Sequence, residues 1–285
     1  MIRWVPRSCA LIIGRFLGWL TDKLYFPRKK VCKINLDIAF GDKLTDREKK
    51  KIISKMYSNL GKNLMDFLRI PLITKENFSE FVTIKGEEHL LAAKKLGKGV
   101  LGITAHYGFW DIIPLYFAFK NFGANFITKA IRNPSLDKFW MEYRTYGGVN
   151  PIFKKNASRD IITILKNNES LGFVIDQNMN ERSGVFVDFF SKKACTLDVV
   201  AKLSRNYGSP VLPMFCIRDE NDLFTIEIGE PIPLEKGDTK EDIIIKSTRA
   251  YTRVLEERLK ERPDHWIWLH KRWKTRPQGE EKIYK

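Results

Sequence analysis

The chain lacks the features that mark several common classes of protein. Its four cysteines, at positions 9, 32, 195 and 216, include no C-x-x-C pair, so neither a zinc site nor a disulfide framework is indicated and a reducing compartment fits best. It has no G-x-S-x-G elbow and no G-x-x-x-x-G-K-[ST] loop, so neither a serine hydrolase nor a P-loop enzyme is supported. A G-x-G-x-x-G match at 97–102 precedes a predicted strand instead of following it, which argues against a dinucleotide site.

Long apolar runs and flexible linkers are missing as well. No window approaches the roughly 18 uncharged apolar residues of a clear membrane span, which excludes a polytopic membrane protein. No repeat and no stretch rich in proline, glycine and serine divides the 285 residues, and 44% of them are hydrophobic, which is ample for a packed core. We therefore expect one main domain over residues 31–285, preceded by an N-terminal segment of residues 1–30.

The net charge of +16 is concentrated at the two ends of the chain. Residues 1–55 carry 14 lysines and arginines against 5 acidic residues, and residues 262–285 carry 7 against 3. The long middle part is nearly neutral. Basic ends around a neutral body favour an anionic partner, which could be phospholipid headgroups, an acidic carrier protein or nucleic acid.

The N-terminal segment has the pattern of an amphipathic helix with a basic flank at 28–30. At 100° per residue, its charged and small residues fall within about a third of the circumference. These residues are Arg3, Arg7, Gly14, Arg15, Gly18, Thr21 and Asp22. Most apolar residues lie on the rest, namely Ile2, Val5, Ile12, Ile13, Phe16, Trp19 and Leu20. The pattern fits an interfacial membrane anchor and an ordinary core helix equally, and no signal-peptide cleavage site follows it.

Short β-branched runs alternate with helical patterns along the rest of the chain. A helix is predicted over 45–69, with Thr45 as its N-cap. Strands are expected at 100–104, 124–128, 149–153, 172–175, 211–217 and 224–228, and helices at 110–122, 133–144, 158–167, 197–206 and 240–260. This order predicts an α/β fold in which a central, mostly parallel mixed sheet is flanked by helices and has an antiparallel edge.

One histidine and one carboxylate stand five residues apart in the apolar run GITAHYGFWDII. His106 follows the strand predicted at 100–104, and Asp111 falls in the first turns of the next helix. A turn between them lets the carboxylate reach back to the imidazole, whereas on one continuous helix residues five apart point about 140° away from each other. This is the orienting half of a catalytic triad without its serine, so the nucleophile would be a hydroxyl of the substrate. The alternative is a buried histidine satisfied by an aspartate for packing reasons.

Polar residues follow two further predicted strands. Arg132 comes after the strand at 124–128, where a guanidinium could bind a phosphate or stabilise an oxyanion. Asp176 and Gln177 come directly after the strand at 172–175. Because function collects at the carboxyl ends of parallel strands, we expect these side chains to contribute to one site. A solvated arginine at a helix start and a simple strand cap are the alternatives.

The C-terminal stretch at 263–277, PDHWIWLHKRWKTRP, interleaves three tryptophans with basic residues. Such a mixture could stack the bases of single-stranded nucleic acid. It could equally lie at a lipid interface, where tryptophan is favoured.

This stretch resembles the terminal signature of the bacterial lipid A biosynthesis acyltransferases, the late acyltransferases of the lysophospholipid acyltransferase-like superfamily. The pair His106-x4-Asp111 is similar to their H-x4-[DE] motif, and Arg132-Asn133, Asp176-Gln177 and residues 185–190 match later blocks in the same order. The similarity runs from residue 33 to residue 277. The chain departs from the pattern at Asn178, where the family usually has an acidic residue, and at Arg15, which interrupts the apolar N-terminal segment.

The resemblance implies an O-acyltransferase, with residues 31–285 as the acyltransferase domain and residues 1–30 as a membrane-associating helix. It implies transfer of an acyl chain from acyl carrier protein, or acyl-coenzyme A, to a hydroxyl of a lipid A precursor, with no metal and no other cofactor. In this scheme His106 is the general base and Asp111 orients it. Arg132 binds a phosphate or the oxyanion, and Asp176 and Gln177 complete the polar network.

The resemblance also sets expectations about partners and place. Tyr107, Phe109 and Trp110 are candidates for the acyl or lipid entrance. The expected partners are acyl carrier protein, the anionic lipid surface and a lipid A precursor, with no nucleic acid, at the cytoplasmic face of the bacterial inner membrane. One alternative keeps the chemistry and changes the acceptor to a glycerophospholipid, a mannolipid or an aminoacyl lipid. The alternative from another class is a basic nucleic-acid-binding protein.

Overall fold

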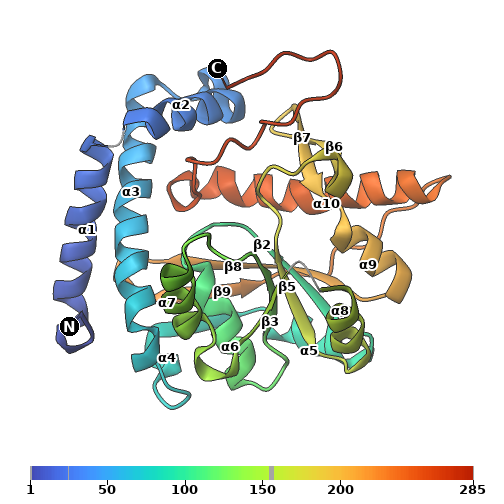
Figure 1. The fold of residues 1–285 in the computed structure, drawn as a ribbon, viewed down its shortest axis with the longest axis horizontal. Helices are drawn as coiled ribbons and strands as arrows, with labels where there is room; N and C mark the ends of the chain where they lie inside the picture. Colours follow the sequence, from blue (N-terminus) through green and yellow to red (C-terminus); the bar gives the residue numbers. More distant parts are fainter. Residues whose placement is uncertain (1, 25, 154–156, 285) are drawn as a thin grey trace. The chain divides into compact units, whose positions relative to one another are not determined.

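The computed structural model describes residues 2–24, 26–153 and 157–284 (Figure 1). The chain forms two compact units. The first unit contains residues 67–174 and 203–233, together with the start of the chain. The second contains residues 4–66, 175–202 and 234–284. The boundary expected between residues 30 and 31 stays a prediction.

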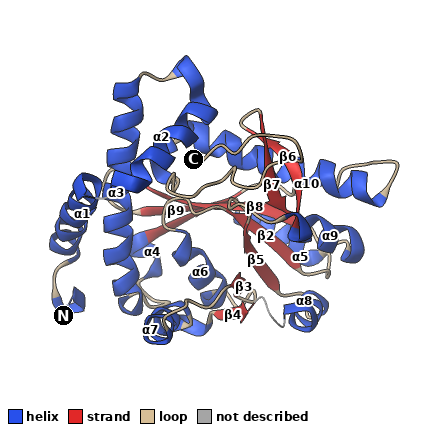
Figure 2. Cartoon of the chain, turned by 45° about the horizontal axis from the view of Figure 1, so that its top comes forward, coloured by secondary structure: helices blue, strands red, loops and turns tan. Residues whose placement is uncertain are grey.

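The first unit is built on a mixed sheet (Figure 2). In sequence order its described strands are β1 (Val82–Lys85), β2 (Val100–Thr104), β3 (Asn125–Thr128), β4 (Asn150–Phe153), β5 (Ser170–Val174), β8 (Val211–Arg218) and β9 (Phe224–Ile228). In space their order is β1-β9-β8-β2-β5-β3-β4. Every pair is parallel except β8 with β9, which is antiparallel. The predicted α/β class with a mostly parallel sheet is confirmed.

The sequence predicted that the antiparallel pair would form an edge of the sheet, and this prediction is wrong. The unpredicted strand β1 pairs in parallel with β9, so β9 is enclosed and β1 is the edge strand. With only four residues, β1 is too short to show a clear period of two, and it stands between two helices in the sequence.

Five α-helices of the described residues lie wholly within the first unit. They are α4 (Phe78–Phe81), α5 (Glu87–Lys95), α6 (Ile113–Phe119), α7 (Pro134–Arg144) and α8 (Ala157–Lys166). Helix α5 packs on β2 and β9, α6 on β8, and α8 on β4 and β5. The core between them contains Leu90 of α5, Phe117 of α6 and Leu212 of β8, all buried. The helix predicted over 110–122 is shorter, because residues 110–112 form a 3-10 helix and Asn121, just after the C-cap Lys120, adopts a positive φ angle that ends α6.

The second unit combines helices with an antiparallel hairpin. It contains α1 (Arg7–Leu24), α2 (Phe26–Phe40), most of α3 (Asp46–Arg69), β6 (Gly184–Phe189), β7 (Lys192–Leu197) and α10 (Lys240–Glu261), while α9 (Val199–Tyr207) runs from this unit into the first. The predicted N-cap of α3 is confirmed, because Thr45 Oγ1 accepts the Glu48 N–H and the Glu48 carboxylate accepts the Thr45 N–H.

Helix α1 packs against α3 through the side that carries Gly14 and Gly18. Gly14 and Gly18 approach Gly61 and Tyr57 of α3 so closely that a Cβ atom at either glycine would overlap the α3 backbone. At one end of this contact Arg7 Nε donates to Asp66 Oδ1 at 2.8 Å. The two helices lie side by side in Figure 1.

The opposite side of α1 leaves large apolar side chains in solvent. Ile12 is 65% exposed, Phe16 57% and Trp19 47%. Arg15, which the pattern placed on the charged side, is exposed as well, and the membrane-associating helix stays a prediction. Met1 and Tyr25 of the expected anchor lie outside the described residues. None of the helices that the structure describes has both the length and the apolar character to cross a bilayer.

Candidate active site

His106 follows strand β2, at the carboxyl end of the parallel strands in the first unit's sheet. The β2 residues Val100, Leu101, Gly102 and Ile103 are buried, and the strand pairs in parallel with β5 on one side and β8 on the other. A run without charged residues suits such a central strand, which is covered on both faces. The Tyr107 N–H then donates to the Ala105 carbonyl at 2.7 Å, which turns the chain sharply. His106 therefore stands, half-buried, just beyond the carboxyl end of β2.

Asp111 lies on a short 3-10 helix, Trp110–Ile112, that leads into α6. Its carboxylate is largely buried, and Oδ1 accepts a hydrogen bond from Arg144 Nε at 3.0 Å. Trp110 lies edge-on to the His106 ring, with 5.1 Å between the ring centroids. His106 and Asp111 thus lie on the same segment between β2 and α6. The Trp110 ring packs against the imidazole of His106, and Arg144 binds the carboxylate of Asp111.

Arg144 is the functional candidate that sequence reasoning missed. It is the last residue of α7, and its guanidinium lies 5.8 Å from the ring centroids of both Phe126 and Trp140. A charge-assisted hydrogen bond of this kind is roughly twice as strong as a neutral one. The pair joins positions 33 residues apart, a separation that no local spacing rule links.

The expected entrance residues differ in exposure. Tyr107 and Phe109 are fully buried, and their rings contact Phe215 and Phe224 at centroid distances of 5.6 and 5.0 Å. Trp110 is partly exposed. Tyr107 and Phe109 are therefore core residues, and their expected role at an entrance stays a prediction that their burial does not favour.

Arg132 is exposed in the loop between β3 and α7. Hydrogen bonds fix the loop on both sides of it, since the Ile131 N–H donates to Asp137 Oδ1 at 2.8 Å and the Asn133 side chain accepts the Leu136 N–H at 3.1 Å. The predicted helix start at residue 133 is confirmed, with Asn133 as N-cap. The loop follows the carboxyl end of β3, at the same edge of the sheet as His106.

Asp176 and Gln177 belong to the second unit, where they bind the C-terminal segment. Asp176 is buried, and its Oδ2 accepts the indole N–H of Trp266 at 2.6 Å. The backbone carbonyl of Gln177 accepts from Arg272 Nη1 at 3.1 Å. The turn at 176–177 is thus fixed by residues about 90 positions later in the chain.

Arg272 is the centre of this arrangement. Its guanidinium donates to the carbonyls of Gln177 and Cys195 and to the Thr196 hydroxyl, and it lies 4.9 Å from the centroid of the Phe189 ring. Burial lowers the pKa of Arg272 to about 10, against the opposing charge of nearby Asp176. At neutral pH the side chain is therefore protonated, and it is a fully buried cation.

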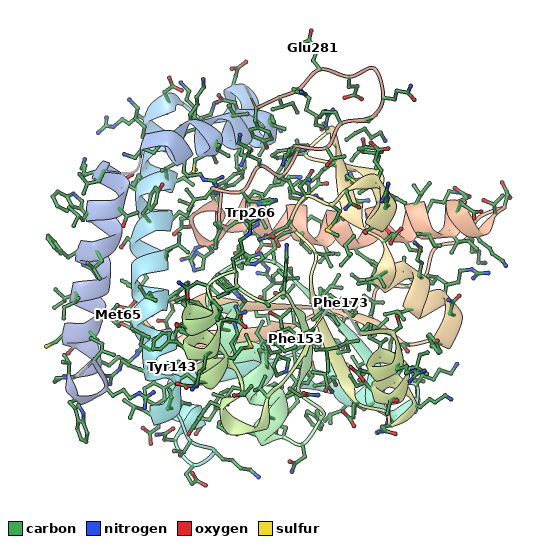
Figure 3. All side chains as sticks on the ribbon, in the orientation of Figure 1. Met65, Tyr143, Phe153, Phe173, Trp266 and Glu281 are labelled. Carbon is green, nitrogen blue, oxygen red and sulfur yellow. The ribbon has the colours of Figure 1, made fainter. Side chains whose placement is uncertain are left out.

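The three tryptophans of the C-terminal stretch are fully buried in the second unit. Trp266, labelled in Figure 3, packs at right angles on Trp268, with 4.6 Å between the ring centroids, and Trp273 packs on Phe189. Base stacking and insertion into a lipid interface both require exposed rings. Both expectations for these tryptophans are therefore wrong, and the nucleic-acid alternative loses the aromatic residues on which it depended.

The structure also explains why Asn178 is compatible with this turn. The Asn178 Nδ2 donates to Thr275 Oγ1, and its Oδ1 accepts the Thr275 N–H at 2.8 Å. The Asn178 N–H donates to His270 Nε2 at 2.9 Å. An amide serves as donor and acceptor at once, which a carboxylate cannot do when ionised.

The comparison with protein families agrees with this order of residues. Residues 1–275 match the family described as bacterial lipid A biosynthesis acyltransferase. The chain belongs to the bacterial lipid A biosynthesis acyltransferase family. It is therefore an acyltransferase, as the sequence predicted.

Individual lipid A acyltransferases are similar along nearly the whole chain. The lipid A biosynthesis lauroyltransferase of Escherichia coli K12 is 24% identical over 285 residues, which cover 96% of this chain and 88% of that protein. Lipid A biosynthesis acyltransferase 2 of Shigella flexneri is 24% identical over 273 residues, which cover 95% and 84%. Among solved structures, the 1-acyl-sn-glycerophosphate acyltransferase PlsC of Thermotoga maritima aligns with a TM-score of 0.40 and 19% identity, covering 90% of this chain and 99% of that one.

The ion pair between Arg144 and Asp111 gives the first prediction for this family member. Because a hydrogen bond to a charged group contributes about 1.5–3 kcal/mol, we expect Arg144→Ala to lower kcat roughly 10- to 100-fold as Asp111 loses its fixed position. KM should change little, and the unfolding midpoint should fall because the largely buried Asp111 carboxylate loses its partner. Arg144→Lys should restore part of both kcat and the midpoint. Steady-state kinetics with thermal unfolding tests this, with exposed Lys166→Ala, at the last residue of α8, as control. A wild-type kcat for Arg144→Ala would contradict it.

Proposed function

We propose that this acyltransferase moves a fatty acyl chain from acyl carrier protein, or acyl-coenzyme A, to a hydroxyl of a lipid A precursor, with His106 as general base. The single observation that supports it best is the connection after β2. There a half-buried imidazole and an arginine-bound carboxylate lie beyond the carboxyl end of a central parallel strand. Ligands of open α/β sheets bind at such strand ends.

The proposed reaction is direct transfer without an acyl-enzyme. An imidazole nitrogen of His106 takes the proton of the acceptor hydroxyl while that oxygen attacks the thioester carbonyl. The tetrahedral oxyanion collapses, the carbon–sulfur bond breaks, and the imidazolium returns the proton to the departing thiolate. The products are an ester and a free thiol. Burial raises the pKa of the Cys195 thiol to about 11 and of the Cys32 thiol to about 12, so neither is an ionised nucleophile at neutral pH.

In this proposal Asp111 orients His106 and favours the imidazolium as it forms, while Arg144 holds Asp111 in place. For Arg132 we propose contact with a phosphate of the acceptor instead of the oxyanion. It precedes the start of α7, whereas Arg144 is the last residue, and at 1.5 Å per residue the two ends of this helix are about 15 Å apart. The positive end of the α7 dipole adds to the attraction of an anion there.

For Asp176 and Gln177 we propose a positioning role. Asp176 accepts the Trp266 indole, and Gln177 offers its carbonyl to Arg272, so both order the turn that follows β5. The proposed reaction assigns no step to a resident metal or to any cofactor besides the acyl thioester.

We further propose that the enzyme works at the cytoplasmic face of the bacterial inner membrane, held there by α1. The apolar side of this helix is exposed, and Arg15 and Lys23 lie exposed along it, as an anionic bilayer surface requires. An acidic carrier protein as donor partner fits the basic residues at the two ends of the chain.

A vesicle experiment tests the role of α1. Phe16 and Trp19 stack on each other with 5.8 Å between centroids, and burying a ring of this size is worth about 1.5–3 kcal/mol. We expect Phe16→Ser with Trp19→Ser to weaken sedimentation with anionic vesicles at least roughly 30-fold. The matched control is Leu91→Ser, an exposed apolar position on α5. Unchanged sedimentation of the double variant would contradict this role.

The proposed activity itself is tested by an acyl-transfer assay read by mass spectrometry. Thioesters of acyl carrier protein and of coenzyme A are each offered with a lipid A precursor as acceptor. Parallel reactions offer a glycerophospholipid, a mannolipid and an aminoacyl lipid. Ester formation on the lipid A precursor is the expected result, and transfer to another acceptor alone would replace the acceptor while keeping the chemistry.

A further inference from the structure

Helix α7 of the first unit carries an apolar face that the protein covers only in part. None of the residues of α7, all of them described, is buried. Leu136, Phe139, Trp140 and Tyr143 fall at helical spacing on one side. Trp140 stacks on Phe67 with 4.4 Å between centroids, and Tyr143, labelled in Figure 3, packs on the same ring at 5.3 Å. Beyond these two rings the face continues into solvent.

The uncovered part of the face consists of Leu136, which is 46% exposed, and Phe139, which is 39% exposed. Exposed cations lie near it in the sequence, namely Lys129 and Arg132 before α7 and Lys138 within it. Of the two acidic side chains in the described segment 129–144, Asp137 accepts the Ile131 N–H and Glu142 is exposed. Exposed apolar side chains on a segment that also carries exposed cations are complementary to anionic headgroups above acyl chains.

The same helix reaches the candidate active site. Its last residue, Arg144, binds Asp111. The same helix therefore carries both the exposed apolar face and a residue of the candidate active site. A lipid acceptor has to leave a bilayer before its hydroxyl can reach His106. A helix that rests on the bilayer beside the site shortens that path.

We infer that the outer face of α7, Leu136 and Phe139 with the exposed cations of the same segment, contacts an anionic bilayer and forms a membrane contact of the first unit itself. The inference deepens the proposed function, because it assumes that the acceptor comes from a bilayer. Its occupant is the lipid surface, and the acyl chain of a soluble donor is the competing occupant that the test has to separate.

A fluorescent probe on α7 provides the test. The exposed Cys9 is first replaced by serine so that the dye does not react with it. The other cysteines, Cys32, Cys195 and Cys216, are buried and stay in place. An environment-sensitive dye is then attached to Leu136→Cys or Phe139→Cys in separate proteins. The matched control is Leu96→Cys, at a position that is 60% exposed in the same unit. Vesicles of phosphatidylethanolamine with phosphatidylglycerol are added, and sedimentation confirms that each protein is bound.

The expected result is a blue shift of the dye at 136 and 139, quenched by brominated acyl chains, with no change at 96. Lys129→Gln with Lys138→Gln should weaken binding to anionic vesicles on the order of 10-fold, and binding to neutral vesicles much less. Vesicle-bound protein whose dye at 136 and 139 stays in water would overturn the inference. A dye that responds to a soluble acyl thioester and not to vesicles would overturn it too.

The outcome of this test does not depend on whether the proposed function is correct. Insertion of the dye needs no substrate, so it is measured even if no acyl transfer is found with any acceptor. Conversely, transfer to a detergent-dispersed acceptor can be observed when the dye at 136 and 139 remains in water.

Discussion

Replacing His106 with alanine is expected to lower kcat for acyl transfer by about 10²- to 10⁴-fold, the usual contribution of a positioned general base. The acceptor hydroxyl then has to lose its proton to water while it attacks the thioester. Because His106 is half-buried beyond the end of β2 and outside the packed core, the variant should remain folded. Kinetics with acyl carrier protein thioester and lipid A precursor, together with circular dichroism, measures both effects.

A matched control separates this effect from a general loss of histidine. His89 lies on α5 of the same unit and is partly exposed, so His89→Ala should leave kcat near the wild-type value. Asp111→Asn should also lower kcat strongly, since the neutral amide no longer favours the imidazolium. Near-native turnover by His106→Ala would overturn the mechanism.

Replacing Arg272 with methionine is expected to lower the free energy of unfolding by about 3–5 kcal/mol, as is usual when one partner of a buried charged network is removed. The carbonyls of Gln177 and Cys195 and the Thr196 hydroxyl would lose their donor, and water cannot readily replace it in this buried place. The unfolding midpoint should fall on the order of 10 °C. Calorimetry or thermal circular dichroism measures the change.

Lys274→Met provides the control for this variant. Lys274 lies two residues away in the same stretch but is exposed, so its replacement should change stability by less than about 0.5 kcal/mol. Equal stabilities of the two variants would show that the buried guanidinium is not needed for the packing of the C-terminal stretch.

The elements predicted well from the sequence are those with strong local signals. Thr45 starts α3 and Asn133 starts α7, because each side chain accepts a backbone N–H at the helix end. The hairpin β6–β7 was missed for the opposite reason. Its two-residue turn is Phe190-Ser191, with φ angles of 50° and 64°, where such turns usually have asparagine and glycine. Tertiary packing stabilises this turn, and neither of its residues is of a type that predicts a turn from the sequence.

The candidate site was predicted as a set of strand-end residues, and only part of its geometry follows from such a pattern. The place of His106 follows from the apolar strand before it. Arg144 could not be found, since its contact with Asp111 depends on how α7 packs beside the sheet. The burial of Arg272 and of the tryptophans was equally hidden, because arginine is almost never fully buried without partners that only the fold supplies.

The long sequence separation between Asp176 and Trp266 sets an order of events during synthesis. Trp266 leaves the ribosome 90 residues after Asp176, and Arg272 follows Gln177 by 95 residues. At typical elongation rates this is a wait of roughly 5 to 20 seconds. During it Phe189 of β6 has neither Trp266 nor Trp273 against it. The nascent hairpin β6–β7 therefore cannot complete its packing until the C-terminal tryptophans arrive.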